Sequence, residues 1–106
     1  MASYGCYTKF TTRAGQRDAL VHLLLEGVAG GATMVDSQLY LINTSPTEPD
    51  VVWVTEVWRS QAEHDASLTL ASVRALIQRA LPLLAGAPER IDVQPIGGLG
   101  LTQALD

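Results

Sequence analysis

The feature that most constrains the fold is the stretch at residues 51–59, VVWVTEVWR, in which apolar side chains occupy both faces of one strand. Successive side chains of a strand point to opposite faces, so the two faces can be read from the alternation. One face carries Val52, Val54, Glu56 and Trp58, and the opposite face carries Val51, Trp53 and Val57. Because both faces are apolar, we expect a covering layer against each of them.

Five further segments surround this strand, and their periodicity alternates between strand and helix. Residues 3–12, 34–43 and 90–96 are rich in β-branched or aromatic residues or alternate in polarity, which predicts three more strands. Leucines at helical spacing in residues 14–31, and an apolar stripe in residues 72–84, predict two helices. The order β-α-β-β-α-β predicts an α+β fold of the ferredoxin-like type, a four-stranded antiparallel sheet with both helices on one face.

Two local signals place helix ends. Gly30 and Gly31 are expected to stop the first helix, because glycine adopts the left-handed conformation without steric cost. Ser60 followed by Glu63 fits a capping box, in which the serine hydroxyl accepts a hydrogen bond from the glutamate amide and the glutamate side chain reaches back. This motif predicts that a helix begins directly after Ser60.

One apolar face of the sheet is not covered by the predicted helices, so we expect a partner against it. The simplest cover is the same face of a second copy, since a two-fold contact uses one patch twice. We therefore expect a homodimer, with Trp53, Val51 and Val57 in the contact. A monomer would instead expose a continuous apolar stripe.

Composition bounds the class of protein. The 106 residues fit a single domain, residues 1–106, with a glycine-rich tail from about residue 97. The net charge is −4 and the basic residues are scattered, which argues against nucleic acid as a partner. We expect no membrane partner and a cytoplasmic location, because the chain has no spanning apolar run and no signal peptide. Cys6, the single cysteine, suits a reducing compartment and is expected to be a buried strand thiol.

A metal site finds no support in residue spacing. The two histidines, His22 and His64, fall in different predicted helices, and no CxxC, HxxxH or HExxH spacing occurs. The tail motif GGLG is followed by six residues, too few for a helix that would hold a phosphate. We therefore predict neither a metal nor another cofactor.

The candidates for chemistry that remain are Trp58 and His64. Trp58 ends a strand and His64 lies about four residues into the capped helix, so both side chains are expected at the mouth of one cleft between sheet and helices. The partial positive charge of a helix N-terminus favours the neutral imidazole, ready to accept a proton. An ordinary core tryptophan and a solvated helix histidine remain the alternatives.

Four more residues are expected to bind substrate in that cleft. Val54 and Glu56 share a strand face with Trp58, and the phenol of Tyr40 either lines the cleft or packs. Arg79, on the last predicted helix, is expected to reach an anionic substrate.

With these motifs, AGQRDAL, TEVW and RSQAEHDASL, the chain resembles the antibiotic biosynthesis monooxygenase family from about residue 4 to residue 96. The resemblance implies a dimeric α+β barrel and a monooxygenase that uses neither metal nor flavin. It would oxidise a quinol-like or polyphenolic aromatic with molecular oxygen, because the substrate itself supplies the electrons. Trp58 would border the pocket, and His64 would accept the substrate proton.

Other activities of the same superfamily fit less well. The haem-degrading enzymes need an asparagine on strand one and a histidine beyond the tryptophan, whereas this chain has Thr8 and Leu68 there. The superfamily also contains isomerases of small sugar-like molecules. The rival from another class is a non-catalytic dimeric barrel that binds a small hydrophobic ligand, since this architecture hosts many functions.

Overall fold

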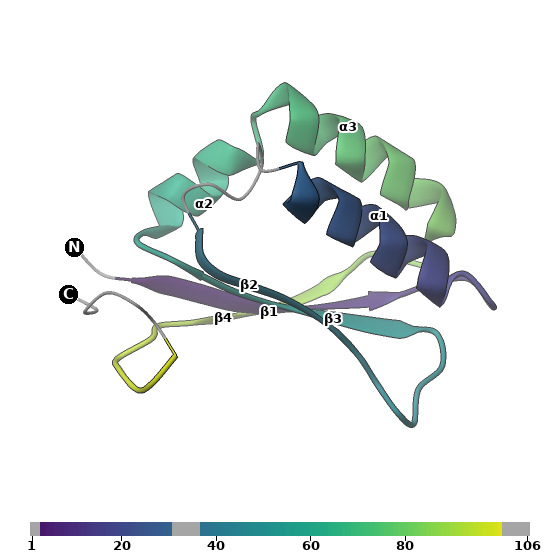
Figure 1. Cartoon of the computed structure of the whole chain (residues 1–106), viewed down its shortest axis with the longest axis horizontal. Helices are drawn as coiled ribbons and strands as arrows, with labels where there is room; N and C mark the ends of the chain where they lie inside the picture. Colours follow the sequence, from purple (N-terminus) through teal and green to yellow (C-terminus); the bar gives the residue numbers. More distant parts are fainter. Residues whose placement is uncertain (1–2, 31–36, 101–106) are drawn as a thin grey trace.

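The computed structural model describes residues 3–30 and 37–100, and its elements follow the predicted order (Figure 1). The elements are β1 (Tyr4–Thr11), α1 (Arg17–Ala29), β2 (Ser37–Thr44), β3 (Val51–Trp58), α2 (Gln61–Ser67), α3 (Ala71–Ala80), the 3-10 turn η1 (Leu81–Leu83) and β4 (Glu89–Val93). Gly31 and the first residues of the predicted second strand lie outside the described ranges, as does the end of the tail. In the described ranges, no helix combines the length and apolarity needed to cross a membrane.

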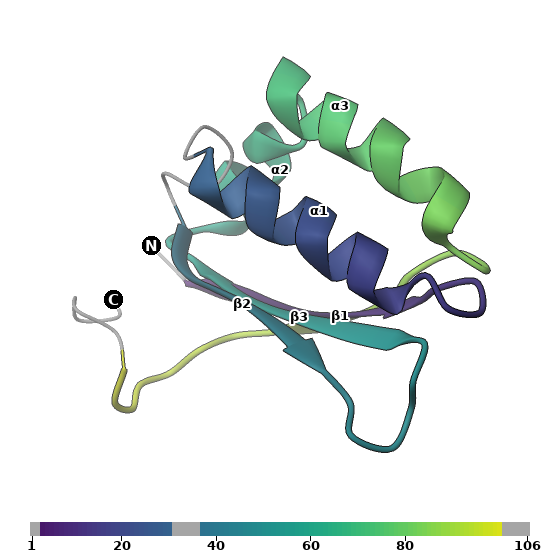
Figure 2. The ribbon, with the colours of Figure 1, turned by 45° about the vertical axis from the view of Figure 1, so that its right-hand side comes forward.

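The four strands form one antiparallel sheet in the order β2-β3-β1-β4. The two central strands pair Tyr4 with Trp58 and Thr8 with Val54. All three helices lie on one side of this sheet, and the other side has no helix over it in the part of the chain that the structure describes (Figures 1 and 2). The ferredoxin-like α+β fold is therefore confirmed.

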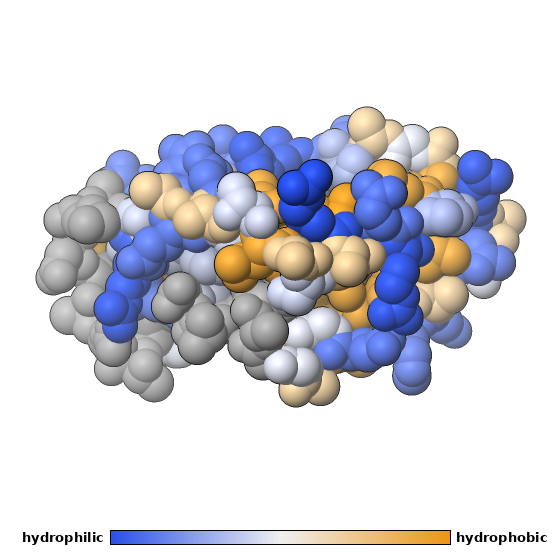
Figure 3. Space-filling view, turned by 90° about the horizontal axis from the view of Figure 1, so that it is seen from above, coloured by the Kyte–Doolittle hydropathy of each residue, from blue (hydrophilic) through white to orange (hydrophobic). Residues whose placement is uncertain are grey.

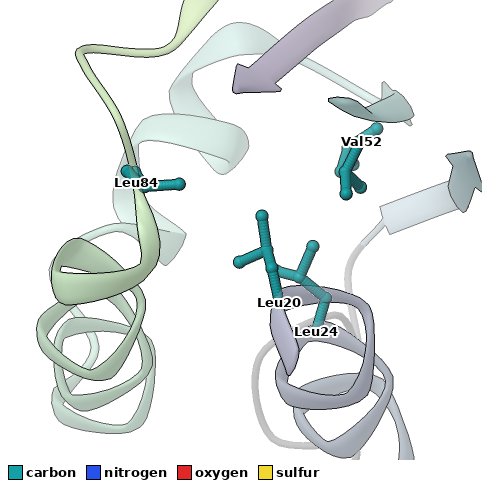
Figure 4. Close-up of a cluster of buried hydrophobic side chains, with 5 residues drawn as sticks. Leu20, Leu24, Val52 and Leu84 are labelled. Atoms are coloured by element: carbon teal, nitrogen blue, oxygen red, sulfur yellow. The ribbon is translucent and has the colours of Figure 1, made fainter. Parts of the chain in front are cut away.

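The main core joins the helix-facing side of β3 to α1. Leu20 and Leu24 point from α1 toward Val52, and Leu84 closes the cluster from the segment after η1 (Figure 4). Burying a side chain of this size stabilises the fold by about 1.5–3 kcal/mol relative to leaving it in water. The leucine spacing in the first helix thus correctly identified the packed face.

The helix ends are confirmed in position, although one prediction about conformation is wrong. The first helix ends at Ala29 as expected, but Gly30 has φ −68°, a right-handed conformation, and its N–H still donates to the Glu26 carbonyl. The serine half of the capping box is present, because the Ser60 hydroxyl accepts from the Glu63 N–H at 3.2 Å. Ser60 therefore starts α2 as predicted.

The predicted helix over residues 72–84 is interrupted near its end. α3 stops at Ala80, and Leu81–Leu83 form a 3-10 turn that contains Pro82. Proline has no N–H to donate to the carbonyl four residues earlier, and its ring crowds that carbonyl. The apolar stripe continued past the proline, so periodicity alone overestimated the length of the helix.

The outer face of the sheet is apolar, as the sequence predicted, but Val51 of the predicted stripe is buried within its own chain. Tyr7, Leu41 and Ile91 lie on this face, on three different strands, and are 43%, 49% and 55% exposed. Trp53 lies on the same face, with the Lys9 ammonium 5.8 Å from its ring centroid. The chain therefore presents an apolar surface on the side away from the helices.

Candidate functional site

A cleft of about 490 Å³ lies between the helix-facing side of the sheet and the helices. Seen from the helix side, apolar side chains show at the surface between hydrophilic ones (Figure 3). The walls come from every layer of the fold: Thr8, Phe10, Leu20, Leu24, Tyr40, Glu56, Trp58, His64, Ser67, Leu68, Val73, Leu76, Ile77, Ala80, Leu81, Leu84, Pro88 and Arg90. Such a volume suits a small molecule, and the apolar walls suit an aromatic or aliphatic one.

Four of the six residues predicted to act on or bind substrate line this cleft. Trp58, Glu56 and Tyr40 come from the sheet and His64 comes from α2. The helix-facing assignment of the Trp58 strand face is therefore correct. Sequence alternation was sufficient here because every second residue of a strand shares a face.

The other two predicted residues do not line the cleft. Val54 is buried in the core beneath it, packed with Leu20 and Leu24. Arg79 lies on the exposed side of α3, where its guanidinium donates to the Glu26 carboxylate at 3.2 Å. The substrate role predicted for these two residues has no support in the structure, because one is covered by packing and the other is held by a surface ion pair.

Glu56 is the polar centre of the cleft. Its Oε1 accepts a hydrogen bond from the Trp58 indole N–H at 2.9 Å, and its Oε2 lies 3.6 Å from the Cys6 sulfur, which donates to it. The His64 Nε2 atom lies 4.0 Å from Oε1. Three elements, β1, β3 and α2, thus direct polar groups toward one carboxylate.

His64 is buried, at 5% exposure, so the alternative of a solvated helix histidine is wrong. Its ring lies 5.0 Å from the Tyr4 ring and edge-on to the Trp58 ring at 5.6 Å, centroid to centroid. Its Nδ1 lies 2.9 Å from Asp65 Oδ1. A neutral imidazole that donates from Nδ1 to this carboxylate keeps Nε2 as an acceptor facing Glu56.

The helix-dipole argument for this histidine is not supported. α2 has seven residues, and His64 falls in its last turn rather than at its N-terminus. The field of a helix end falls off within the first or last turn, and His64 is the fourth of the seven residues, so neither end of this short helix dominates at its ring. The contact with Asp65 orients the imidazole instead.

The neighbouring acids of the cleft are held in their protonated forms. Burial, followed by the charge of Glu56, raises the pKa of the Cys6 thiol to about 11. Burial and the same carboxylate also raise the pKa of Tyr40. Cys6 is fully buried, as predicted, and near neutral pH it is a thiol rather than a nucleophilic thiolate.

Sequence reasoning missed Arg90. It lines the cleft from β4 and pairs with Asp92 through a 3.1 Å contact from Nε, while Asp92 also accepts a hydrogen bond from the Tyr4 hydroxyl at 2.7 Å. The usable signal was the strand alternation of RIDV, which puts Arg90 and Asp92 on one face. The register of β4 against β1 was needed to show that this face is the cleft face.

The structure also brings together three groups with metal-binding chemistry, Cys6, Glu56 and His64. One ligand atom from each lies within 4.8 Å of the others. Motif searches missed this group because its members are far apart in sequence and come from three different elements. In addition Thr8 and Leu68, which stand where the haem-degrading enzymes have asparagine and histidine, both line the cleft.

Comparisons with known proteins converge on one family. The sequence profile of the family described as antibiotic biosynthesis monooxygenase matches residues 3–79. A solved protein from Chloroflexus aurantiacus, provisionally described by that activity, is 39% identical, with 94% of this chain and 99% of that chain covered and a TM-score of 0.84.

Two further solved proteins with the same provisional description share the fold. The one from Caulobacter crescentus is 18% identical, covers 91% of this chain and 92% of its own, and has a TM-score of 0.82. The one from Nitrosomonas europaea is 10% identical, with coverages of 93% and 95% and a TM-score of 0.83. A comparison with curated proteins found no match.

Proposed function

This chain belongs to the antibiotic biosynthesis monooxygenase family, and on that premise we propose that it oxidises a quinol-like or polyphenolic aromatic with molecular oxygen, without a metal or flavin in the reaction. The observation that carries the proposal is the buried His64 imidazole on the wall of an apolar cleft. Its Nδ1 is held by Asp65 at 2.9 Å, and its Nε2 faces the polar end of the cleft. A positioned base beside an apolar pocket is what this chemistry requires of the protein.

The reaction begins with proton transfer from a phenolic hydroxyl of the substrate to Nε2 of His64. The phenolate then gives one electron to oxygen, which forms a phenoxyl radical and superoxide. These combine at a ring carbon that carries hydrogen to give a peroxide anion, which takes the proton back from His64 and becomes a hydroperoxide. Loss of water from the hydroperoxide leaves a quinone carbonyl, so one oxygen atom enters the product and the other leaves as water.

The surroundings of the base support binding of an aromatic anion. Trp58 forms an aromatic wall against His64, and Tyr40 adds a second ring to the lining. Arg90 places a guanidinium on the cleft wall, and although its Nε pairs with Asp92, its other nitrogens would donate to a phenolate in the cleft. Leucine, isoleucine and valine side chains form much of the remaining wall and limit access of water.

The proposal includes a homodimer in the cytoplasm. The exposed apolar side chains of Tyr7, Leu41 and Ile91 lie on one face of the sheet, and the same face of a second copy can cover this patch around a two-fold axis. Trp53 and Val57 continue this patch, whereas Val51 is already buried within its own chain and adds little to it. A single buried thiol, Cys6, suits a reducing compartment.

Oxygen consumption by metal-stripped protein tests the proposed activity. A panel of reduced quinols and polyphenols is offered to the wild type, to His64→Ala and to the matched control His22→Ala, whose histidine is exposed on α1. Uptake above the spontaneous rate that falls by about 10²–10⁴-fold in His64→Ala alone is expected for loss of a general base. Equal turnover in both variants would show that His64 is not the proton acceptor.

A binding protein without catalysis is the second candidate, and the largely apolar lining of the cleft favours it. The same panel separates the two functions, because a binding protein would raise its melting temperature with one compound and consume no oxygen. That outcome would replace the oxygenase proposal.

A further inference from the structure

We propose that Cys6, Glu56 and His64 form a binding site for a divalent metal ion of the zinc class at the polar end of the cleft. The inference rests on the placement of these three side chains and is independent of the oxygenase proposal. The proposal concerns metal binding alone. Oxygenase turnover by the chelator-treated, metal-free protein would therefore not contradict it.

The donor set is suitable for zinc. Thiolate, imidazole and carboxylate are the three ligand types that zinc takes in proteins, at about 2.3 Å for sulfur and about 2.0–2.2 Å for nitrogen and oxygen. Ligands around a tetrahedral ion at these bond lengths stand roughly 3.3–3.6 Å apart. Here the Cys6 sulfur is 3.6 Å from Glu56 Oε2, and His64 Nε2 is 4.0 Å from Glu56 Oε1. These two distances end on different oxygens of Glu56, and the three ligand atoms lie within 4.8 Å of one another, so the side chains must close in by up to about 1.5 Å to share one ion.

The hydrogen bonds that orient the three proposed ligands resemble those found around metal sites in proteins. A metal-binding histidine usually donates its other ring N–H to a carboxylate, which fixes the tautomer and aims the free nitrogen at the ion. His64 has this arrangement, with Nδ1 at 2.9 Å from Asp65 Oδ1 and Nε2 turned toward Glu56. Glu56 is likewise held by the Trp58 indole N–H at 2.9 Å.

Charge and access also favour a divalent ion. Cys6 is a thiol in the metal-free protein, so binding of the ion displaces its proton to solvent. The resulting thiolate and the Glu56 carboxylate together neutralise two positive charges, and the loaded cluster carries no net charge beside a neutral imidazole. Glu56 and His64 line the cleft, which provides an entry path and leaves the cleft side for a fourth ligand such as water. Cys6 and His64 are buried, and the site therefore excludes bulk solvent on its protein side.

Metal binding and the proposed oxygenase chemistry would compete for one atom. An ion on Nε2 of His64 occupies the lone pair that would otherwise accept the substrate proton. If both proposals hold, zinc inhibits turnover, and if only the metal site exists, zinc binds with no turnover to inhibit.

Titration of the tag-free, chelator-treated full chain with Zn²⁺ and Co²⁺ tests the site. We expect one ion per chain by calorimetry, a zinc-dependent rise in melting temperature, and a thiolate-to-cobalt charge-transfer band in the near ultraviolet. Cys6→Ser should abolish the band. Asp65→Asn, at a half-exposed side chain that should not affect folding, should weaken Zn²⁺ binding by about 10–100-fold.

His22→Gln is the matched control, because this histidine lies on the surface of α1 and should leave affinity and spectrum unchanged. The absence of binding by the folded wild type would overturn the proposal. So would an unchanged affinity in Asp65→Asn together with an unchanged cobalt band in Cys6→Ser. If Cys6→Ser fails to fold, His64→Gln provides the same test through loss of one ligand.

Discussion

The indole N–H of Trp58 donates a hydrogen bond to Oε1 of Glu56, two residues earlier on the same face of β3, at 2.9 Å. A hydrogen bond to a charged acceptor contributes about 1.5–3 kcal/mol when its partners are shielded from water. This pair joins the packing of the cleft to the orientation of its central carboxylate.

Substitution Trp58→Phe keeps an aromatic ring and removes this donor. We expect the free energy of unfolding to fall by about 2 kcal/mol, because the Glu56 carboxylate loses its donor and the smaller ring leaves a void. Urea denaturation of Trp58→Phe, Glu56→Gln and the double variant measures the coupling. Additive effects within about 0.5 kcal/mol would show that the two side chains act independently.

The two arginines offer a matched comparison for substrate binding. Arg90→Gln should raise KM for a phenolic substrate by about tenfold, since a charge-assisted contact contributes about 1.5–3 kcal/mol. Arg79→Gln should leave KM unchanged, because that guanidinium pairs with Glu26 away from the cleft. Steady-state kinetics on both variants checks the assignment, which an equal rise in KM for the two would contradict.

The cap of α2 supports the element that carries His64. Ser60→Ala removes the hydroxyl that accepts from the Glu63 N–H, and should lower the free energy of unfolding by about 1 kcal/mol. Ser72→Ala, at an exposed position inside α3, should change it by less than about 0.5 kcal/mol. Chemical denaturation compares the two, and a loss of the same size in both would argue against a capping role.

From the environment of Tyr4, we expect the free energy of unfolding to fall at alkaline pH. Burial and then the hydrogen bond donated to Asp92 raise the pKa of Tyr4 above its ordinary value of 10.0. A raised pKa in the folded state contributes stability that is present below the unfolded value and is lost as pH rises toward the folded one. Unfolding free energy should therefore decline above pH 10.

The variant Tyr4→Phe should show a shallower decline above this pH, measured by urea denaturation across an alkaline series. Tyr7→Phe is the control, because Tyr7 lies on the opposite face of the sheet from Asp92. Identical alkaline slopes for wild type and Tyr4→Phe would show that Tyr4 does not carry the effect.

The proposed dimer can be tested by light scattering, which measures the molar mass of the protein as it elutes from a gel-filtration column. Leu41→Lys places a charge in the part of the outer apolar patch that lies on the edge strand β2 and should convert a dimer to monomer. Leu25→Lys, at a similarly exposed leucine of α1, should leave the assembly unchanged. A monomeric wild type, or a Leu25→Lys variant that dissociates while Leu41→Lys does not, would contradict the proposed interface.

Local patterns predicted the fold well because they depend on neighbours in sequence. The alternation around Trp58 and the cap at Ser60 located a strand, its inward face and the start of the next helix. Arg79 was misplaced because its side of α3 is decided by packing against α1, which spacing alone does not show. Pro82 shortened a helix whose apolar stripe continued past it.

The site was less accessible to sequence reasoning, since its polar contacts join distant elements. Glu56 was identified as a cleft residue, but its contacts with Cys6 and His64 depend on the pairing of β1 with β3 and on the docking of α2. Arg90 lies on the cleft side because the register of β4 against β1 pairs it with Thr8. No spacing rule covers such a set, because each contact is fixed by tertiary structure.

The sheet order has a consequence for synthesis of the chain. β1 is the earliest of the described strands to be synthesised, yet one of its two edges is completed by β4, the latest of them. The Tyr4 hydroxyl and its acceptor Asp92 are 88 positions apart. Until then, the growing chain exposes a central strand edge that can pair with other chains. Nascent chains that stop before Glu89 should therefore stay protease-sensitive and depend on chaperones, while the arrival of the last strand completes the sheet.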